Sequence, residues 1–244
     1  MSNYDIGSLS SYDAPYSIDD YSVSTYDSTD VFEFDLFGTS DINLALTPSG
    51  GDADLTLYMD NGDGYFDPYT DTSVASSIRG GTADDSINIA DQGAGTYFAQ
   101  VSYYSSSSSS ITYDLNLSAT SGYTASNLLP TETNVGSLDS DLTYYGAVGD
   151  SNTSDTYYFN LDFYEGVNIT LSGLSSDADI RLVQDYNNNA IVDDYEVQQS
   201  STFGSTTSEF MSTDLSGNYF VQVYQFSGDT NYTLGFDHFT STNV

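Results

Sequence analysis

Apolar residues alternate with polar ones at period two along most of the chain, which is the pattern of half-buried β-strands. These runs lie at residues 32–36, 42–46, 55–57, 97–101 and 113–117, and again at 157–161, 167–171, 180–182, 219–223 and 232–236. Turn-forming stretches such as "TPSGGD" and "DNGDG" separate them. The pattern therefore predicts an all-β fold, with seven or eight short antiparallel strands forming a β-sandwich in each half.

The second half of the chain repeats the first. The stretch "DADLTLYMDNGDG" at residues 52–64 matches "DADIRLVQDYNNN" at 177–189, and "GTYFAQV" at 95–101 matches "GNYFVQV" at 217–223. A period near 120 residues is the size of a whole domain and not of one solenoid repeat. The repeat predicts two tandem domains, residues 1–122 and 123–244. Periodicity stops and Gly, Pro, Ser and Thr collect at the expected linker, about residues 118–134.

Acidic residues dominate the charged positions. The chain has 2 Lys and Arg residues against 36 Asp and Glu residues, a formal net charge of −34. Nucleic acid is excluded as a partner, because phosphate binding requires a basic face. Such a chain repels itself unless cations or a saline medium neutralise it.

Other features of the composition narrow the class of protein. Cysteine is absent, so no disulfide framework forms. No stretch approaches the roughly 18 apolar residues of a membrane span, so membrane insertion is not expected. The start of the chain lacks the basic and apolar regions of a signal peptide, which leaves a removed signal, another export route and an internal location open.

The stretch "DYNNNAIVDDYE" at 185–196 matches a twelve-residue calcium loop position by position. The predicted Ca²⁺ ligands are the side chains of Asp185, Asn187, Asn189, Asp193 and Glu196 and the carbonyl of Ile191. Ala190 is the misfit, since glycine normally occupies that position. The alternative is a solvated turn rich in Asp and Asn.

The corresponding stretch of the first half, "DNGDGYFDPYTD", is less regular. Here the candidate ligands are Asp60, Asn61, Asp63 and Asp67, with Asp71 as a further oxygen donor, but no single register satisfies the calcium template.

Two pairs of aspartates also begin strands in the repeated motif. Asp52 with Asp54, and Asp177 with Asp179, are i,i+2 pairs whose carboxylates face the same way. They are either cation ligands or turn caps.

The sequence has few of the residue types that catalytic sites commonly use. The only histidine, His238, lies near the C-terminus and is expected to be exposed, and there is no cysteine for a nucleophile. A pair of carboxylates for glycoside hydrolysis is the one catalytic alternative. We expect no enzyme. Arg181 alternates with apolar neighbours and is expected to point away from the core.

The order of motifs resembles the bacterial pre-peptidase C-terminal domain. The residues that carry the resemblance are "DVFEF" or "DTYYF", then "NLAL" or "NITL", then "DADLTLY" or "DADIRLV", then "GTYFAQV" or "GNYFVQV", then a closing strand with tyrosine. The resemblance implies a non-catalytic, jelly-roll-like β-sandwich, usually appended to secreted proteases, collagenases and surface proteins and often associated with calcium. Members of the family usually follow an enzyme, and none precedes these domains here, which favours a stand-alone role.

The polar N-terminal residues suggest an assembly function. Residues of about 1–15 are expected to form an extension that frays unless something holds it. One such mode is strand addition to a neighbouring copy, which would build filaments or a surface layer.

The expected protein is therefore extracellular or on the cell surface, calcium-stabilised, and structural or adhesive. Its partners are copies of itself, through strand addition or domain packing, or a surface glycan or protein. The alternatives are a monomeric accessory module that binds a glycan or a protein, and an intracellular protein of a halophile.

Overall fold

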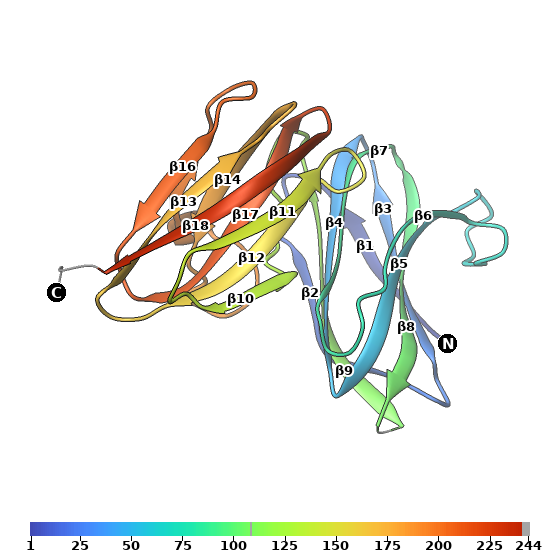
Figure 1. The fold of residues 1–244 in the computed structure, drawn as a ribbon. Helices are drawn as coiled ribbons and strands as arrows, with labels where there is room; N and C mark the ends of the chain where they lie inside the picture. The colour runs from blue at the N-terminus through green and yellow to red at the C-terminus, as the bar shows by residue number, and fades with distance from the viewer. Residues whose placement is uncertain (108, 241–244) are drawn as a thin grey trace. The chain divides into compact units, whose positions relative to one another are not determined.

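The computed structural model describes residues 1–107 and 109–240, and almost all of its regular structure is β-strand (Figure 1). One short 3-10 turn, η1 (Asp194–Glu196), interrupts the strands. The chain divides into two compact units, Met1–Gly122 and Tyr123–Val244, here called unit 1 and unit 2. The predicted all-β class with two β-sandwiches is confirmed. In the described part of the chain no helix is long and apolar enough to cross a membrane.

Unit 1 consists of a five-stranded and a four-stranded sheet. The first has the order β1-β3-β8-β5-β6, with β1 (Ser2–Leu9), β3 (Thr29–Leu36), β8 (Gly95–Ser106), β5 (Gly51–Met59) and β6 (Thr72–Ser77). The second has the order β2-β9-β4-β7, with β2 (Tyr16–Ser24), β9 (Ser110–Thr120), β4 (Ser40–Ser49) and β7 (Asp85–Gln92).

Unit 2 repeats this topology strand for strand. Its five-stranded sheet has the order β10-β12-β17-β14-β15, with β10 (Thr133–Ser137), β12 (Ser154–Leu161), β17 (Gly217–Ser227), β14 (Asp177–Val183) and β15 (Val197–Ser201). Its four-stranded sheet has the order β11-β18-β13-β16, with β11 (Leu142–Val148), β18 (Thr230–Thr240), β13 (Glu165–Ser172) and β16 (Glu209–Thr213). Each unit thus has nine strands, more than the seven or eight expected.

The N-terminal residues belong to the sandwich. Residues 2–9 form β1, which pairs in parallel with β3 from Ser2 opposite Asp30 to Leu9 opposite Leu36. The expectation that residues 1–15 lie outside the domain is therefore wrong for this stretch. Its polar composition concealed the strand because only alternate residues face inward, and among these Tyr4 stacks on Phe32 with ring centroids 5.1 Å apart.

The core of each unit lies between its two sheets and uses the alternating residues that the sequence pattern marks. In unit 1 these include Phe34, Leu44, Leu57 and Val101, all fully buried. In unit 2 the same positions of the fold hold Phe159, Ile169, Leu182 and Val223. The period-two pattern thus identified the inner face of every central strand.

A tyrosine–aspartate pair joins the two sheets of each unit, buried in unit 1 and partly buried in unit 2. In unit 1 the Tyr113 hydroxyl on β9 donates to Asp30 Oδ2 on β3 at 2.6 Å. In unit 2 the Tyr232 hydroxyl on β18 donates to Asp155 Oδ2 on β12. Burial raises the pKa of Asp30 and, together with the hydrogen bond to Asp30, the pKa of Tyr113. This bond explains why the aspartate that opens the "DVFEF" and "DTYYF" motifs recurs with a tyrosine in the closing strand.

Replacing the tyrosine of this pair should destabilise its unit. We expect Tyr113→Phe to lower the free energy of unfolding by about 1–3 kcal/mol, because it leaves the buried Asp30 carboxyl without its donor. Urea denaturation followed by tyrosine fluorescence measures the change. The control is Tyr145→Phe, whose side chain is 79% exposed. Equal, small effects of both substitutions would show that the pair does not join the sheets.

Candidate metal centres

The predicted calcium loop of unit 2, residues 185–196, connects β14 to β15 and is called loop 2. Its first residue, Asp185, holds the backbone: Oδ1 accepts the N–H of Asn188 at 2.7 Å and Oδ2 accepts the N–H of Ala190 at 3.0 Å. The side-chain oxygens of Asn187 and Asn189 each accept the N–H two residues further on, at 3.0 and 2.9 Å. The side-chain oxygens at loop positions 1, 3 and 5 therefore all accept hydrogen bonds from the loop's own backbone.

Glu196 closes loop 2 from its other end. Its side chain is fully buried, and its two carboxylate oxygens accept the N–H groups of Tyr186 and Asp193, both at 3.0 Å. The first of these bonds spans the loop from position 12 back to position 2. The carboxylate therefore fixes the two ends of the loop against each other.

Ala190 occupies the position where a calcium loop normally has glycine, and its backbone adopts the conformation that this position requires. Ala190 has φ +56°, in the left-handed region, so the loop makes the sharp turn that glycine normally provides. For a residue with a Cβ atom this conformation costs about 1–2 kcal/mol. The backbone therefore has the turn of a calcium loop in spite of the alanine.

The corresponding loop of unit 1, residues 60–71, connects β5 to β6 and is called loop 1. Its buried last residue, Asp71, accepts the N–H of Asn61 at 3.2 Å and of Asp67 at 2.8 Å, as Glu196 does in loop 2. Its first residue, Asp60, accepts the N–H of Gly64 with both oxygens, at 3.3 and 3.2 Å. The two loops are thus counterparts with the same closure.

Asp71 is only a further oxygen donor in the sequence, because the template register that starts at Asp60 places Gly62 and Gly64 at ligand positions. Asp60 and Asp71 lie 125 residues before Asp185 and Glu196, which is the offset of the repeat itself. Alignment of the two copies, and not comparison with a template, is the signal that identifies it. Asp63 Oδ1 and Asp67 Oδ1 instead accept the N–H two residues further on, both at 3.0 Å.

The predicted ligands are only partly brought together. In loop 2 the Asn187 amide nitrogen donates to Asp193 Oδ2 at 3.1 Å, so these two side chains meet directly. Within residues 1–107 and 109–240, no three His, Asp or Glu side chains are arranged to hold a metal ion. A cation in either loop would therefore require asparagine or backbone oxygens as further ligands. Their chemistry fits, since every ligand type in the predicted sets is a hard oxygen donor.

The chain that precedes β10 lies against loop 2. The N–H of Leu129 donates to the Ala190 carbonyl at 2.8 Å, and the N–H of Val192 donates to the Asn127 carbonyl at 2.9 Å. Leu128 and Leu129 are both buried. The central residues of loop 2 are therefore held by unit 2's own N-terminal segment.

Arg181 supports the same segment. Its Nε donates to Gln222 Oε1 at 2.7 Å and its terminal nitrogen donates to the Ser126 carbonyl at 2.6 Å. Burial lowers the pKa of Arg181 to about 10. The arginine points away from the core as expected, and its hydrogen bonds go to an amide and a carbonyl and not to an acid.

His238 differs from the expectation of an exposed tail residue. It lies in β18, opposite Val167 of β13, and its side chain is 17% exposed. The ring nitrogen Nε2 of His238 lies 3.6 Å from Glu165 Oε1. The backbone N–H of His238 donates to Asp141 Oδ1 at 2.9 Å. The histidine is thus part of a strand and a neighbour of acids.

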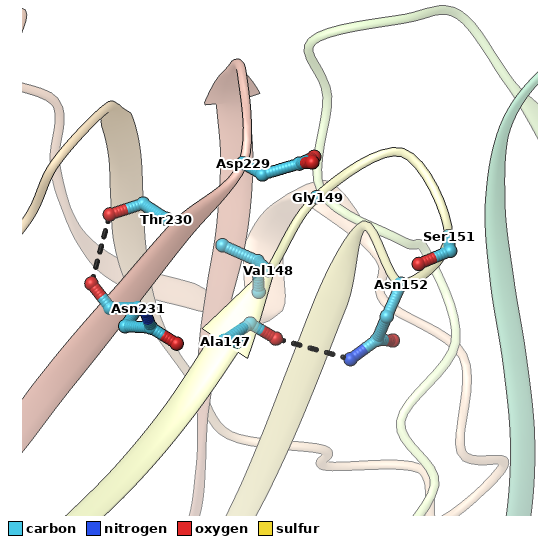
Figure 2. Close-up of a pocket in the computed structure, with 8 residues that line it drawn as sticks. All are labelled: Ala147, Val148, Gly149, Ser151, Asn152, Asp229, Thr230 and Asn231. Carbon is cyan, nitrogen blue, oxygen red and sulfur yellow. Dashed lines mark hydrogen bonds between the residues drawn. The ribbon is translucent and has the colours of Figure 1, made fainter.

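A pocket of about 270 Å³ lies in unit 2 where β11 ends and β18 begins (Figure 2). Figure 2 shows the Asn152 amide turned towards the Ala147 carbonyl, a contact of 3.5 Å. The one carboxylate of the lining, Asp229, accepts the N–H of Asp150 at 3.2 Å. The lining residues are Ala147, Val148, Gly149, Ser151, Asn152, Asp229, Thr230 and Asn231. The pocket is smaller than common ligand sites, which hold about 300–1,000 Å³.

Residues 28–103 match the sequence profile of the bacterial pre-peptidase C-terminal domain. Unit 1 contains this match, so the predicted resemblance to this family is confirmed, and unit 2 repeats the motifs and strand order of unit 1. Domains of this family are non-catalytic accessory modules of secreted proteins. No curated protein sequence matches the chain.

Several solved structures are similar at low identity. The pre-peptidase C-terminal domain of a Bacillus anthracis collagenase is 18% identical, with 48% of this chain and 94% of that chain covered and a TM-score of 0.35. Aeromonas hydrophila PliG, a periplasmic inhibitor of g-type lysozyme, is 14% identical, with 48% and 97% covered and a TM-score of 0.32. The CUB1-EGF-CUB2 domains of rat MASP-1 are 9% identical, with 96% and 99% covered and a TM-score of 0.28.

The strained turn of loop 2 gives a test of its geometry. We expect Ala190→Gly to raise the free energy of unfolding by about 1 kcal/mol, because glycine adopts positive φ without strain. Ala147→Gly, in the exposed strand β11, should instead lower it by roughly 0.5–1 kcal/mol. Urea denaturation of both variants measures the difference. A loss of stability in Ala190→Gly equal to that in the control would contradict the left-handed turn.

Proposed function

We propose that this chain is a secreted, calcium-stabilised accessory module of extracellular or cell-surface assemblies, with one Ca²⁺ site in each of loops 1 and 2. One observation supports this most strongly: both loops are closed by a buried carboxylate that accepts two N–H groups of the loop, one of them from its opposite end. The closure recurs at the offset of the repeat, with Asp71 in one copy and Glu196 in the other.

The residues of loop 2 would hold the ion through oxygen atoms. Asp185, Asp193 and Glu196 offer carboxylates, Asn187 and Asn189 offer amide oxygens, and Ile191 offers its carbonyl. In loop 1 the donors are fewer and comprise Asp60, Asn61, Asp63, Asp67 and Asp71. When bound, Ca²⁺ would supply positive charge among these carboxylates. The chain's own contribution is to hold these oxygens close together against their repulsion.

Calcium in loop 2 would also order the chain around it. The carbonyl of Ala190 and the N–H of Val192 already hold the segment at 127–129. Fixing Ile191 between them would therefore stabilise the N-terminal segment of unit 2. Weak sites of this kind are filled by the millimolar calcium found outside cells, since extracellular modules bind with dissociation constants of about 10⁻⁴–10⁻³ M. This agrees with an extracellular location.

A structural role through self-association rests on a separate observation. β1 and β6 are the two edge strands of the five-stranded sheet of unit 1. An open edge is a template for strand addition by another chain. Copies of this chain would associate there and form filaments or a surface layer. The competing function is a monomeric module that binds a glycan or a protein.

Calcium should stabilise the protein through loop 2. Addition of Ca²⁺ at 100 times its dissociation constant should raise the free energy of unfolding by about 2.7 kcal/mol per site, seen as a higher melting temperature than in excess chelator at equal ionic strength. Asp185→Asn keeps an oxygen for the loop's N–H groups but removes a charge, and should lose part of this gain. The matched control is Asp162→Asn, an exposed aspartate outside the loops. A parent protein with the same melting temperature in calcium and in chelator would falsify the calcium proposal.

Self-association should depend on concentration and on calcium. Sedimentation velocity of the full chain is expected to show species larger than the 26.4 kDa monomer in calcium, and fewer of them in chelator. A monomer under all conditions would rule out the assembling role. A monomer that binds a glycan array saturably would establish the accessory-module alternative in its place.

A further inference from the structure

Three acidic side chains gather in each unit where the chain passes from one sheet to the other. In unit 2 these are Asp177 and Asp179 on β14 and Glu209 at the start of β16, here called acid cluster 2. In unit 1 the corresponding residues, acid cluster 1, are Asp52 and Asp54 on β5 and Asp85 at the start of β7. Loops 1 and 2 contain none of these residues.

The two clusters are built in the same way. Glu209 accepts hydrogen bonds from the Ser201 hydroxyl and from the N–H of Phe203, the latter at 2.9 Å. Asp85 accepts them from the Ser77 hydroxyl and from the N–H of Arg79, the latter at 2.8 Å. Since β15 and β16 belong to different sheets, the Glu209 carboxylate holds the sheets together at this point.

Acid cluster 2 is strongly desolvated. Glu209 is fully buried, Asp179 is 4% exposed, and Asp177 Oδ1 is buried with no hydrogen-bond partner among the described residues. Burial, then the charges of Asp177 and Glu209, raises the pKa of Asp179 to about 7. On the neighbouring strand β17, Tyr224 lies opposite Asp179, and its own pKa is raised to about 12, first by burial and then by Asp179, while Arg181 acts to lower it. The groups around Asp179 are thus acids and a neutral phenol, with Arg181 two residues further along β14.

The two clusters differ in their basic neighbour. In unit 1, burial raises the pKa of Asp85, the hydrogen bonds from the Ser77 hydroxyl and the Arg79 N–H lower it, and the opposing charges of Asp54 and Arg79 act more weakly. Unit 2 has Phe203 at the position of Arg79, 58% exposed. The chain has only two basic side chains apart from its histidine, and the other, Arg181, donates to Gln222 and to the Ser126 carbonyl. Acid cluster 2 therefore has no basic side chain of its own.

We propose that acid cluster 2 is a pH-sensitive switch that holds a proton in the folded unit and loosens the connection from β14 to β16 as the pH rises towards neutrality, whereas Arg79 makes unit 1 less sensitive. A proton relieves the repulsion between carboxylates that share a buried site, and here Asp179 is buried and Asp177 Oδ1 has no hydrogen-bond partner among the described residues.

The direction of the pH effect follows from the proton balance. In the folded unit Asp179 keeps its proton up to a higher pH than in the unfolded chain, where its pKa is the ordinary aspartate value of 3.8. Stability is therefore greatest below about pH 4 and falls as the pH rises to about 7. For one proton the unfolding equilibrium changes by about tenfold per pH unit within this range. Repulsion across the whole chain acts on both units, and burial also raises the pKa of Asp30 and of Asp54 in unit 1, so variants of Asp179 and of Phe203 isolate the cluster.

Hydrogen exchange on the full chain tests the switch. Protection factors, corrected for the intrinsic exchange rate, are measured at pH 5 and pH 7 in fixed calcium and ionic strength. Amides of β14, β15 and β16 are expected to lose on the order of 10- to 100-fold protection, and those of β5, β6 and β7 clearly less. Equal losses in both units would overturn the proposal.

Exchange of the basic residue between the units gives the decisive variants. Phe203→Arg should reduce the loss in unit 2, and Arg79→Phe should increase the loss in unit 1. The control is Leu215→Arg, which adds the same charge at an exposed position beyond the opposite end of β16. Asp179→Asn should abolish most of the pH dependence of unit 2. The switch is excluded if Phe203→Arg behaves like Leu215→Arg, or if Asp179→Asn keeps the pH dependence of the parent.

Discussion

The constraint on which this structure depends is the need to bury carboxylates almost without basic side chains. With two Lys and Arg residues against 36 acids, the fold holds its buried acids by O–H and N–H donors instead. Tyr113 holds Asp30 between the sheets of unit 1. Two backbone N–H groups hold Glu196 across loop 2. Hydrogen bonds to charged groups are worth about twice those between neutral groups, so each such carboxylate strengthens the place where it lies.

These arrangements occur twice, and the differences between the copies mark where the units diverge. The tyrosine–aspartate pairs are the same in both units, as expected for a requirement of the fold. The closing carboxylate of the proposed calcium loop changes from Asp71 to Glu196, and the residue beside the acid cluster changes from Arg79 to Phe203. If both proposals hold, loop 2 and acid cluster 2 would give unit 2 a greater dependence on cations and protons than unit 1.

Much of the fold could be predicted from the sequence, because period-two alternation and the repeat report burial directly. The alternation identified the inward residues Phe34 and Phe159 and the offset aligned the two sandwiches. It missed β1, since an edge strand such as Ser2–Leu9 buries only part of one face and its sequence is polar. The candidate sites were harder, because a template records spacing and not backbone. It marked Ala190 as a misfit, which the positive φ resolves, and failed in loop 1, where Gly62 and Gly64 stand at ligand positions. Acid cluster 2 could not be predicted, because Glu209 meets Asp179 only through the pairing of strands from both sheets.

A crystal structure grown in millimolar calcium, with anomalous diffraction recorded at long wavelength, tests the central claim most directly. The account predicts an anomalous peak in loop 2, surrounded by oxygens of Asp185, Asn187 and Glu196 at about 2.3–2.6 Å. A second peak is predicted in loop 1 beside Asp60 and Asp71. Density that shows both loops closed by their own N–H groups, with no anomalous peak in either, would contradict the account.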